Sequence, residues 1–133
     1  MQIIILDGSN GTGKSTLRHE LMQRMNYDVL TIDRFTPSIW VYDRLRGIDR
    51  RDVLEFEEKF DKLNPLIVIC KCIPEIAKKR TQDNVLRKIN FNIEDQDREF
   101  DIYYSKYSRY RNLIRVNTEL PIEDCIKKII ERL

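Results

Sequence analysis

The 133-residue sequence predicts an α/β fold: a three-layer sandwich in which a short parallel sheet of about four strands is flanked by helices. Short apolar runs typical of buried strands occur four times along the chain. Segments with helical spacing of apolar residues separate them, and a glycine-rich loop joins the first run to the first helical segment. Strands that alternate with helices favour parallel pairing with right-handed crossovers. Such a sheet binds ligands at the carboxyl ends of its strands.

The first half of the chain contains two predicted strands, residues 2–7 and 28–33, because each run is short, apolar and rich in β-branched residues. Between them, apolar residues recur at helical spacing from Lys14 onward, and Asn26 is a suitable C-terminal cap. The first predicted helix therefore begins at the end of the glycine-rich loop.

Two helices are predicted next. Thr36 followed by Pro37 is typical of an N-cap and a first helical residue, and Gly47 is expected to end that helix. Asp49 is suited to cap the following helix, which Asn64 and the proline after it should end.

The second half repeats the pattern. Residues 66–72 form a solid apolar run expected to be a central strand, and Pro74 begins a helix after it. Asn92 is suited to cap a further helix, because acidic residues occupy the first turn that follows. Residues 113–117 are the fourth predicted strand, and Pro121 opens a final amphipathic helix.

The glycine-rich loop carries the strongest chemical signal. Residues 8–15 read G-S-N-G-T-G-K-S, which fits the pattern G-x-x-x-x-G-K-[ST] between a strand and a helix. Glycines let backbone N–H groups converge on phosphate oxygens, Lys14 reaches the β and γ phosphates, and the Ser15 hydroxyl is placed for Mg²⁺. The alternative is an ordinary glycine-rich turn. The residues expected to bind phosphate are Gly8, Asn10, Gly11, Thr12, Gly13, Lys14, Ser15 and Thr16.

Charged residues at the strand ends supply the other parts that phosphoryl transfer needs. Asp33 is expected to act as a base or a metal-side carboxylate, with Arg34 beside it as an anion clamp. Asp7 either holds Mg²⁺ through water or caps the turn. Lys71 stands at the end of the third strand, where many proteins with this loop keep an acid, so Asp7 and Asp33 are left to share the metal and base roles.

The connection between residues 81 and 92 lacks periodicity and is interpreted as a lid. Arg80, Arg87 and Lys88 are expected either to close over nucleotide phosphates or to be solvated surface charges. Three aromatic residues that follow Asp33 are suited to stack on an acceptor base: Phe35, Trp40 and Tyr42. For Phe35 and Tyr42, packing in the core is the alternative.

Composition limits the remaining possibilities. The net charge of +2 gives no global signal for nucleic acid or membrane, and no apolar run is long enough to span a bilayer. The three cysteines form no C-x-x-C pair and no His lies nearby, so neither disulfides nor a zinc site is expected. We expect one domain, residues 1–133, in a cytoplasmic protein. Oligomeric state is not predicted.

The chain resembles the thymidylate kinase-like branch of P-loop nucleotide kinases. Residues 7–16 resemble that family's loop, and Asp33-Arg34-Phe35 with the downstream Ser38 and Tyr42 is similar to its D-R-[YFH] motif. The likeness continues in order along almost the whole chain. There are three departures: Asn10 replaces an Asp, Lys71 replaces an Asp, and most of the segment that encloses a nucleoside monophosphate is missing.

The resemblance implies an ATP-dependent kinase in which the loop binds ATP with Mg²⁺, Asp33 and Arg34 face the acceptor, and Arg87 belongs to the lid. The implied acceptor is a deoxynucleotide, either a free monophosphate such as dTMP or a modified pyrimidine nucleotide. Bacteriophages encode small kinases similar to this family that phosphorylate 5-hydroxymethyluracil in DNA, and the shortened acceptor region fits such a substrate. A protein that binds nucleotide as a regulator without transfer is the remaining alternative.

Overall fold

The computed structural model describes residues 1–48, 51–82 and 91–133. Four parallel strands form one sheet in the order β2-β1-β3-β4. The strands are β1 (Gln2–Asp7), β2 (Val29–Asp33), β3 (Leu66–Lys71) and β4 (Leu113–Asn117). The helices are α1 (Lys14–Arg24), α2 (Thr36–Leu45), α3 (Arg51–Asp61), α4 (Pro74–Gln82), α5 (Ile93–Tyr107) and α6 (Ile122–Arg132). The predicted fold class is confirmed.

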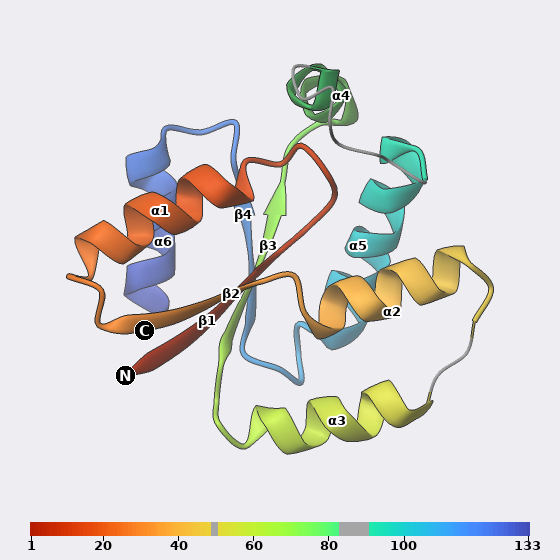
Figure 1. Ribbon diagram of the computed structural model, residues 1–133, viewed down its shortest axis with the longest axis horizontal. Coiled ribbons are helices and arrows are strands. Elements are labelled where there is room, and N and C mark those ends of the chain that lie inside the picture. Colours follow the sequence, from red (N-terminus) through yellow and green to blue (C-terminus); the bar gives the residue numbers. More distant parts are fainter. Residues whose placement is uncertain (49–50, 83–90) are drawn as a thin grey trace.

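Helices cover both faces of the sheet (Figure 1). Alternate residues of the strands point to opposite faces, so Ile4 of β1 packs with Leu21 of α1 and Ile126 of α6. On the other face, Ile5 packs with Val41 of α2 and residues of α5. The strands are buried on both sides, which explains why their sequences are nearly continuous apolar runs rather than alternating ones.

Helix ends follow the predicted signals with one difference. Asn26 has a left-handed φ of 50° just beyond α1, and the Asn92 side chain accepts a hydrogen bond from the Asp95 N–H at 2.8 Å, as a cap does. The difference is at α2, where Thr36 is the first helical residue and Phe35 occupies the cap position. Asp49, the predicted cap of α3, lies outside the described residues.

The change at α2 has a cause in the neighbouring strand. The Asp7 carboxylate accepts hydrogen bonds from the N–H groups of Phe35 at 3.1 Å and Ser38 at 2.9 Å. An aspartate from β1 thus satisfies the free donors at the start of α2, which a local capping side chain would otherwise do. The same contact fixes α2 beside the loop that follows β1.

Candidate active site

The loop between β1 and α1 packs closely on its neighbours. Gly8 has φ 137° and Gly11 has φ 80°, and a Cβ at either position would lie 2.3 Å from a backbone carbonyl oxygen, that of Cys70 or of Ala77 respectively. Only glycine fits these positions. The loop is therefore held against β3 and α4, and its backbone leads into the amino terminus of α1, where free N–H groups favour anions.

Lys14 is buried beneath this loop. Its side chain donates to Ser9 O at 2.8 Å, to Gly8 O at 3.2 Å and to Thr12 Oγ1 at 3.3 Å. Burial, aided by the nearby Arg34 charge, lowers the pKa of Lys14 from 10.5 to about 8. A negatively charged ligand in the loop would favour the charged ammonium.

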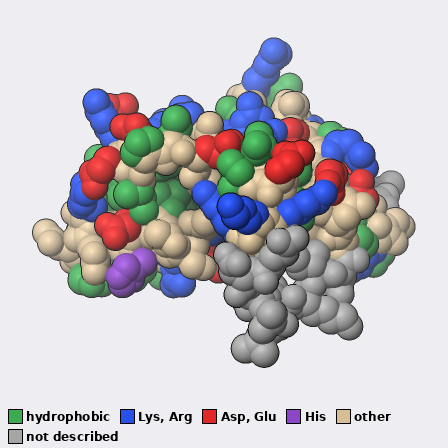
Figure 2. Space-filling model, turned by 90° about the horizontal axis from the view of Figure 1, so that it is seen from above, with side chains coloured by type: hydrophobic (Ala, Val, Ile, Leu, Met, Phe, Trp, Pro, Cys, Tyr) green, Lys and Arg blue, Asp and Glu red, His purple; other side chains and the backbone are tan. Residues whose placement is uncertain are grey.

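A cavity of about 580 Å³ opens on the outer side of the loop. Three exposed polar residues, Ser15, Asp33 and Arg80, line it, and apolar side chains such as Leu120 and Ile122 line it as well. Its remaining lining residues are Gly11, Thr12, Gly13, Lys14, Thr16, Leu17, Thr118 and Cys125. Figure 2, which looks onto the carboxyl ends of the strands, shows hydrophobic side chains inside a hollow on the side of α1 and α6.

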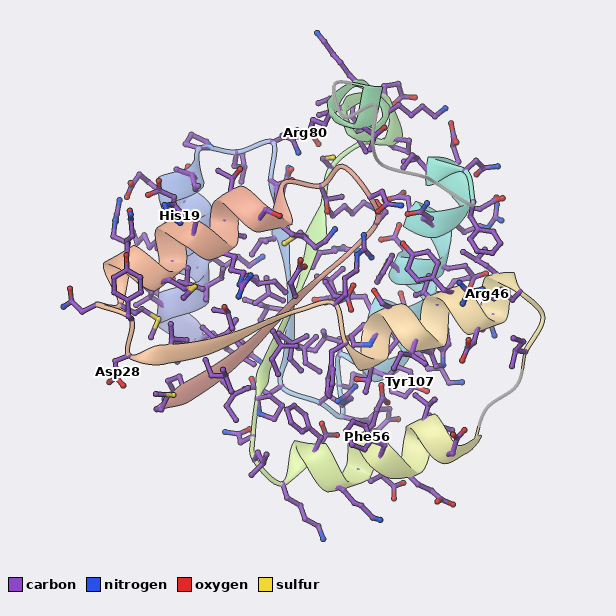
Figure 3. All side chains as sticks on the ribbon, viewed as in Figure 1. His19, Asp28, Arg46, Phe56, Arg80 and Tyr107 are labelled. Atoms are coloured by element: carbon purple, nitrogen blue, oxygen red, sulfur yellow. The ribbon has the colours of Figure 1, made fainter. Side chains whose placement is uncertain are left out.

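Arg80 joins the phosphate loop to the turn after β4. One guanidinium nitrogen lies 3.3 Å from Gly11 O and 3.4 Å from Thr118 Oγ1, and the other donates to Thr118 O at 3.3 Å. Figure 3 labels Arg80 between α4 and the segment that follows β4. The guanidinium thus lies at the margin of the large cavity, where it can contact an anion or a planar ring.

Asp7 is fully buried on the inner side of the loop. Besides the two α2 donors, its carboxylate accepts from Gly8 N at 2.8 Å and from Ser38 Oγ at 2.5 Å. Burial raises the pKa of Asp7, and the hydrogen bonds from Ser38, Phe35 and Gly8 act in the opposite direction. These contacts are those of the capping interpretation, and the metal-side role of Asp7 stays a prediction.

Asp33 and Arg34 are adjacent in sequence but point to different sides of the loop. Asp33 ends β2, is exposed and lines the large cavity. Arg34 has a left-handed φ of 61°, and its guanidinium turns inward. It donates to Gly8 O, Ser38 Oγ and Tyr42 Oη, each at 3.2 Å, and to Asn10 Oδ1 at 2.7 Å.

A second cavity of about 220 Å³ lies on this inner side. Its lining residues are Asn10, Arg34, Ser38, Tyr42, Arg46, Phe91 and Gln96. Gln96 is fully buried, and its Oε1 accepts from Asn10 N at 2.9 Å and from Tyr42 Oη at 3.0 Å. Gln96 was not among the site residues expected from the sequence. The available signal was a glutamine on the same helical face as Ile93 and Phe100, both of which are buried.

The other predicted residues have varied environments. Phe35 packs against Phe60, so its ring belongs to the core, as one of its two alternatives predicted. Trp40, for which base stacking was predicted, packs against Tyr103 and lines neither cavity beside the loop. Tyr42 instead faces the small cavity. Arg87 and Lys88, with most of the predicted lid, lie outside the described residues, so their roles remain predictions.

Lys71, found where an acid was expected, is paired with α5. Its ammonium contacts Asp101 and lies 3.7 Å from Asp97. It lines neither of the two cavities beside the loop. Within residues 1–48, 51–82 and 91–133, no group of three or more His, Cys, Asp or Glu is arranged to hold a metal ion, and no helix is long and apolar enough to cross a membrane.

Comparisons with known proteins agree with the architecture. No protein-family model matches the sequence, and no curated protein matches it. Solved structures do match. A deoxyadenosine kinase from M. mycoides with bound dCTP superposes with a TM-score of 0.71 at 14% identity, covering 98% of each chain. The YorR protein of Bacillus subtilis, in complex with phosphorylated GDP, superposes with a TM-score of 0.72 at 21% identity, covering 98% of this chain and 94% of that one.

The chain has the P-loop kinase fold. Another structure of the M. mycoides enzyme, with products dCMP and a flexible dCDP bound, superposes with a TM-score of 0.69 at 14% identity, covering 98% of this chain and 97% of that chain. At these identities the comparisons establish the arrangement of strands and helices. The chemistry of this chain rests on its own side chains.

Proposed function

We propose that this protein is an ATP-dependent phosphotransferase that moves the γ-phosphoryl group of ATP to a deoxynucleotide-class acceptor. One observation carries the proposal. The carbonyl oxygen of Gly8 accepts from Lys14 Nζ and from Arg34 Nη1, both at 3.2 Å. Lys14 lines the large cavity and Arg34 lines the small one, so side chains from the two cavities bring two positive charges together at Gly8 O. Phosphoryl transfer needs such a preorganised cluster between donor and acceptor.

The large cavity is the proposed ATP site. The loop from Gly8 to Thr16 and Lys14 bind the phosphates, and Arg80 contacts the nucleotide at the margin. The exposed Ser15 hydroxyl and Asp33 carboxylate are hard oxygen ligands within this one cavity, so they suit a Mg²⁺ ion bound mainly by phosphates and water. When bound, Mg²⁺ neutralises charge on the phosphates.

The small cavity is the proposed acceptor side, with Arg34 as the anion clamp. The first choice of acceptor is a deoxynucleoside monophosphate such as dTMP. The fold shared with a deoxyadenosine kinase supports an acceptor of the deoxynucleoside and deoxynucleotide class, and the choice of a monophosphate rests on the resemblance to the thymidylate kinase-like family. The proposed catalytic residues are Lys14, Asp33 and Arg34. Asp33, which lines the ATP side, is assigned the metal-side role rather than direct contact with the acceptor.

A second acceptor class is the hydroxyl of 5-hydroxymethyluracil in DNA. The volume of the small cavity, about 220 Å³, favours it. Sites that enclose a free small molecule usually measure about 300–1,000 Å³. An acceptor nucleotide held in a polymer gains binding energy from contacts outside the cavity and needs less enclosure.

Two acceptor arms in one assay distinguish these substrates. The protein is incubated with γ-labelled ATP and Mg²⁺, together with either the four deoxynucleoside monophosphates or duplex DNA containing 5-hydroxymethyluracil. Label in a free nucleotide supports the first acceptor, and label only in DNA supports the second. Binding of ATP with no transfer to either acceptor would favour the regulator alternative and contradict the proposal.

Asp33→Asn tests the mechanism. Turnover should fall by about 100-fold or more, while ATP affinity in the absence of Mg²⁺ stays within about threefold, because a metal-side carboxylate acts on the bound ion. Asp28→Asn, an exposed aspartate before the opposite end of β2, is the matched control (Figure 3). Undiminished turnover in Asp33→Asn would remove this residue from the mechanism.

A further inference from the structure

We infer that Gln96 is a positioning residue for phosphoryl transfer: it closes a ring of hydrogen bonds that holds Arg34 against the phosphate loop. This inference rests on the proposed function. The ring contains four residues from three parts of the chain. Gln96 Oε1 accepts from Asn10 N, Asn10 Oδ1 accepts from Arg34 Nη2, Arg34 Nη1 donates to Tyr42 Oη, and the Tyr42 hydroxyl donates back to Gln96 Oε1.

The ring fixes the orientation of the Gln96 amide. Asn10 N–H can only donate, and the carbonyl of Phe91 can only accept. Gln96 Nε2 donates to Phe91 O at 2.8 Å, so the amide oxygen must face Asn10 and Tyr42. Gln96 is fully buried, so loss of its side chain would remove three hydrogen bonds from the interior at once.

Arg34 depends on this arrangement for its position. Its backbone has a left-handed φ of 61°, and Asn10 Oδ1 and Tyr42 Oη are two of the groups that fix its guanidinium. Gln96 contacts both of these residues and not Arg34 itself. Rotation of either one would move the guanidinium away from Gly8 O, where the Lys14 ammonium also lies.

Phe91, which lines the small cavity, is joined to this ring of hydrogen bonds through its carbonyl oxygen. Its aromatic ring stacks on Tyr42 with centroids 6.2 Å apart, and the Arg46 guanidinium lies 5.7 Å above it. The Gln96 amide therefore connects the phosphate loop, the proposed acceptor clamp and the residue just before α5. The amide satisfies all three neighbours, whereas an ionised carboxylate cannot donate to Phe91 O and an aliphatic side chain cannot bond any of them.

The test compares Gln96→Leu, Gln96→Glu and Tyr42→Phe, with Gln23→Leu on the exposed surface of α1 as the control. Three measurements are made on each: hydrogen exchange of the Asn10 amide by NMR, kcat and KM for transfer, and thermal unfolding. In Gln96→Leu we expect Asn10 exchange to accelerate and kcat to fall, each by about tenfold or more, with KM for ATP changed by less than about threefold. The control should match the wild type.

Gln96→Glu keeps both acceptor contacts, so Asn10 should stay protected and kcat should lie between wild type and Gln96→Leu. Tyr42→Phe breaks the ring at another bond and should lower kcat while leaving Asn10 protected. If Gln96→Leu does not fold, Gln96→Glu and Tyr42→Phe still test the inference.

Two outcomes in Gln96→Leu would overturn the inference. Fast exchange of the Asn10 amide with unchanged kcat would make Gln96 purely structural. Unchanged exchange and kcat would overturn the inference as well. Wild-type protein with no transferase activity would instead refute the proposed function.

Discussion

Two aspartates end neighbouring strands of this sheet and have opposite environments. Asp7 ends β1 and is fully buried with four hydrogen bonds from the loop and α2. Asp33 ends β2, is exposed and lines the large cavity. The difference separates two tasks: the Asp7 carboxylate is satisfied by the protein itself and fixes α2 beside the loop, while the Asp33 carboxylate is open to the large cavity.

Lys14 lies at the boundary between the inner and outer sides of the phosphate loop, so its removal should have the largest effect. Lys14→Ala should lower transfer by about 100- to 1,000-fold, because it deletes a preorganised charge from the phosphate site. Transfer of label from γ-labelled ATP measures the loss. Lys79→Ala, an exposed lysine on α4, is the control. Transfer by Lys14→Ala at the wild-type rate would exclude the loop as the site of chemistry.

Substitution of the two aspartates should affect the stability of the protein very differently. Asp7→Asn should lower the free energy of unfolding by about 3 kcal/mol, because an amide group would face a backbone donor in a fully buried position. Asp33→Asn should change the free energy of unfolding by less than about 0.5 kcal/mol. Urea denaturation measures both. Equal destabilisation by the two substitutions would contradict the division of tasks between the two aspartates.

The pH dependence of ATP affinity tests the charge on Lys14. Burial lowers the pKa of Lys14 to about 8, so above this pH the free protein holds a neutral amine. Phosphate binding favours the ammonium, so ATP binding above about pH 8 requires proton uptake. The affinity for ATP should therefore be about tenfold lower at one pH unit above the pKa than at a pH well below it. Calorimetry in buffers of different ionisation enthalpy measures the uptake, and Lys14→Ala should show none.

Substitution of Arg80 should have the smallest of these effects. Arg80→Ala removes a guanidinium at the margin of the large cavity and should weaken ATP binding by about fivefold, with kcat nearly unchanged. Arg80→Lys should recover only part of the loss, because an ammonium cannot form the same set of contacts with Gly11 and Thr118. Calorimetric affinities of the three proteins measure the series. A large fall in kcat would instead place Arg80 at the reacting group.

Most of the fold could be predicted because its signals are local. The strand ending at Asp33 and the cap at Asn92 follow from short-range chemistry: a run of β-branched residues and an Asx side chain before a helix. The start of α2 could not be predicted to the residue, because its N–H groups are satisfied by Asp7, which lies 31 positions before Ser38. A capping residue outside the local sequence leaves no pattern near the helix.

By itself the sequence determined the order of strands and helices along the chain and the place of the glycine-rich loop between β1 and α1, since both depend on periodicity and on glycines that tolerate positive φ. Tertiary structure decided that Asp33 and Arg34 point to opposite sides of that loop, and that Gln96 meets Asn10 across 86 positions. Hydrogen bonds between distant segments arise only when the chain has folded, because the packing of α2 and α5 sets which side chains meet.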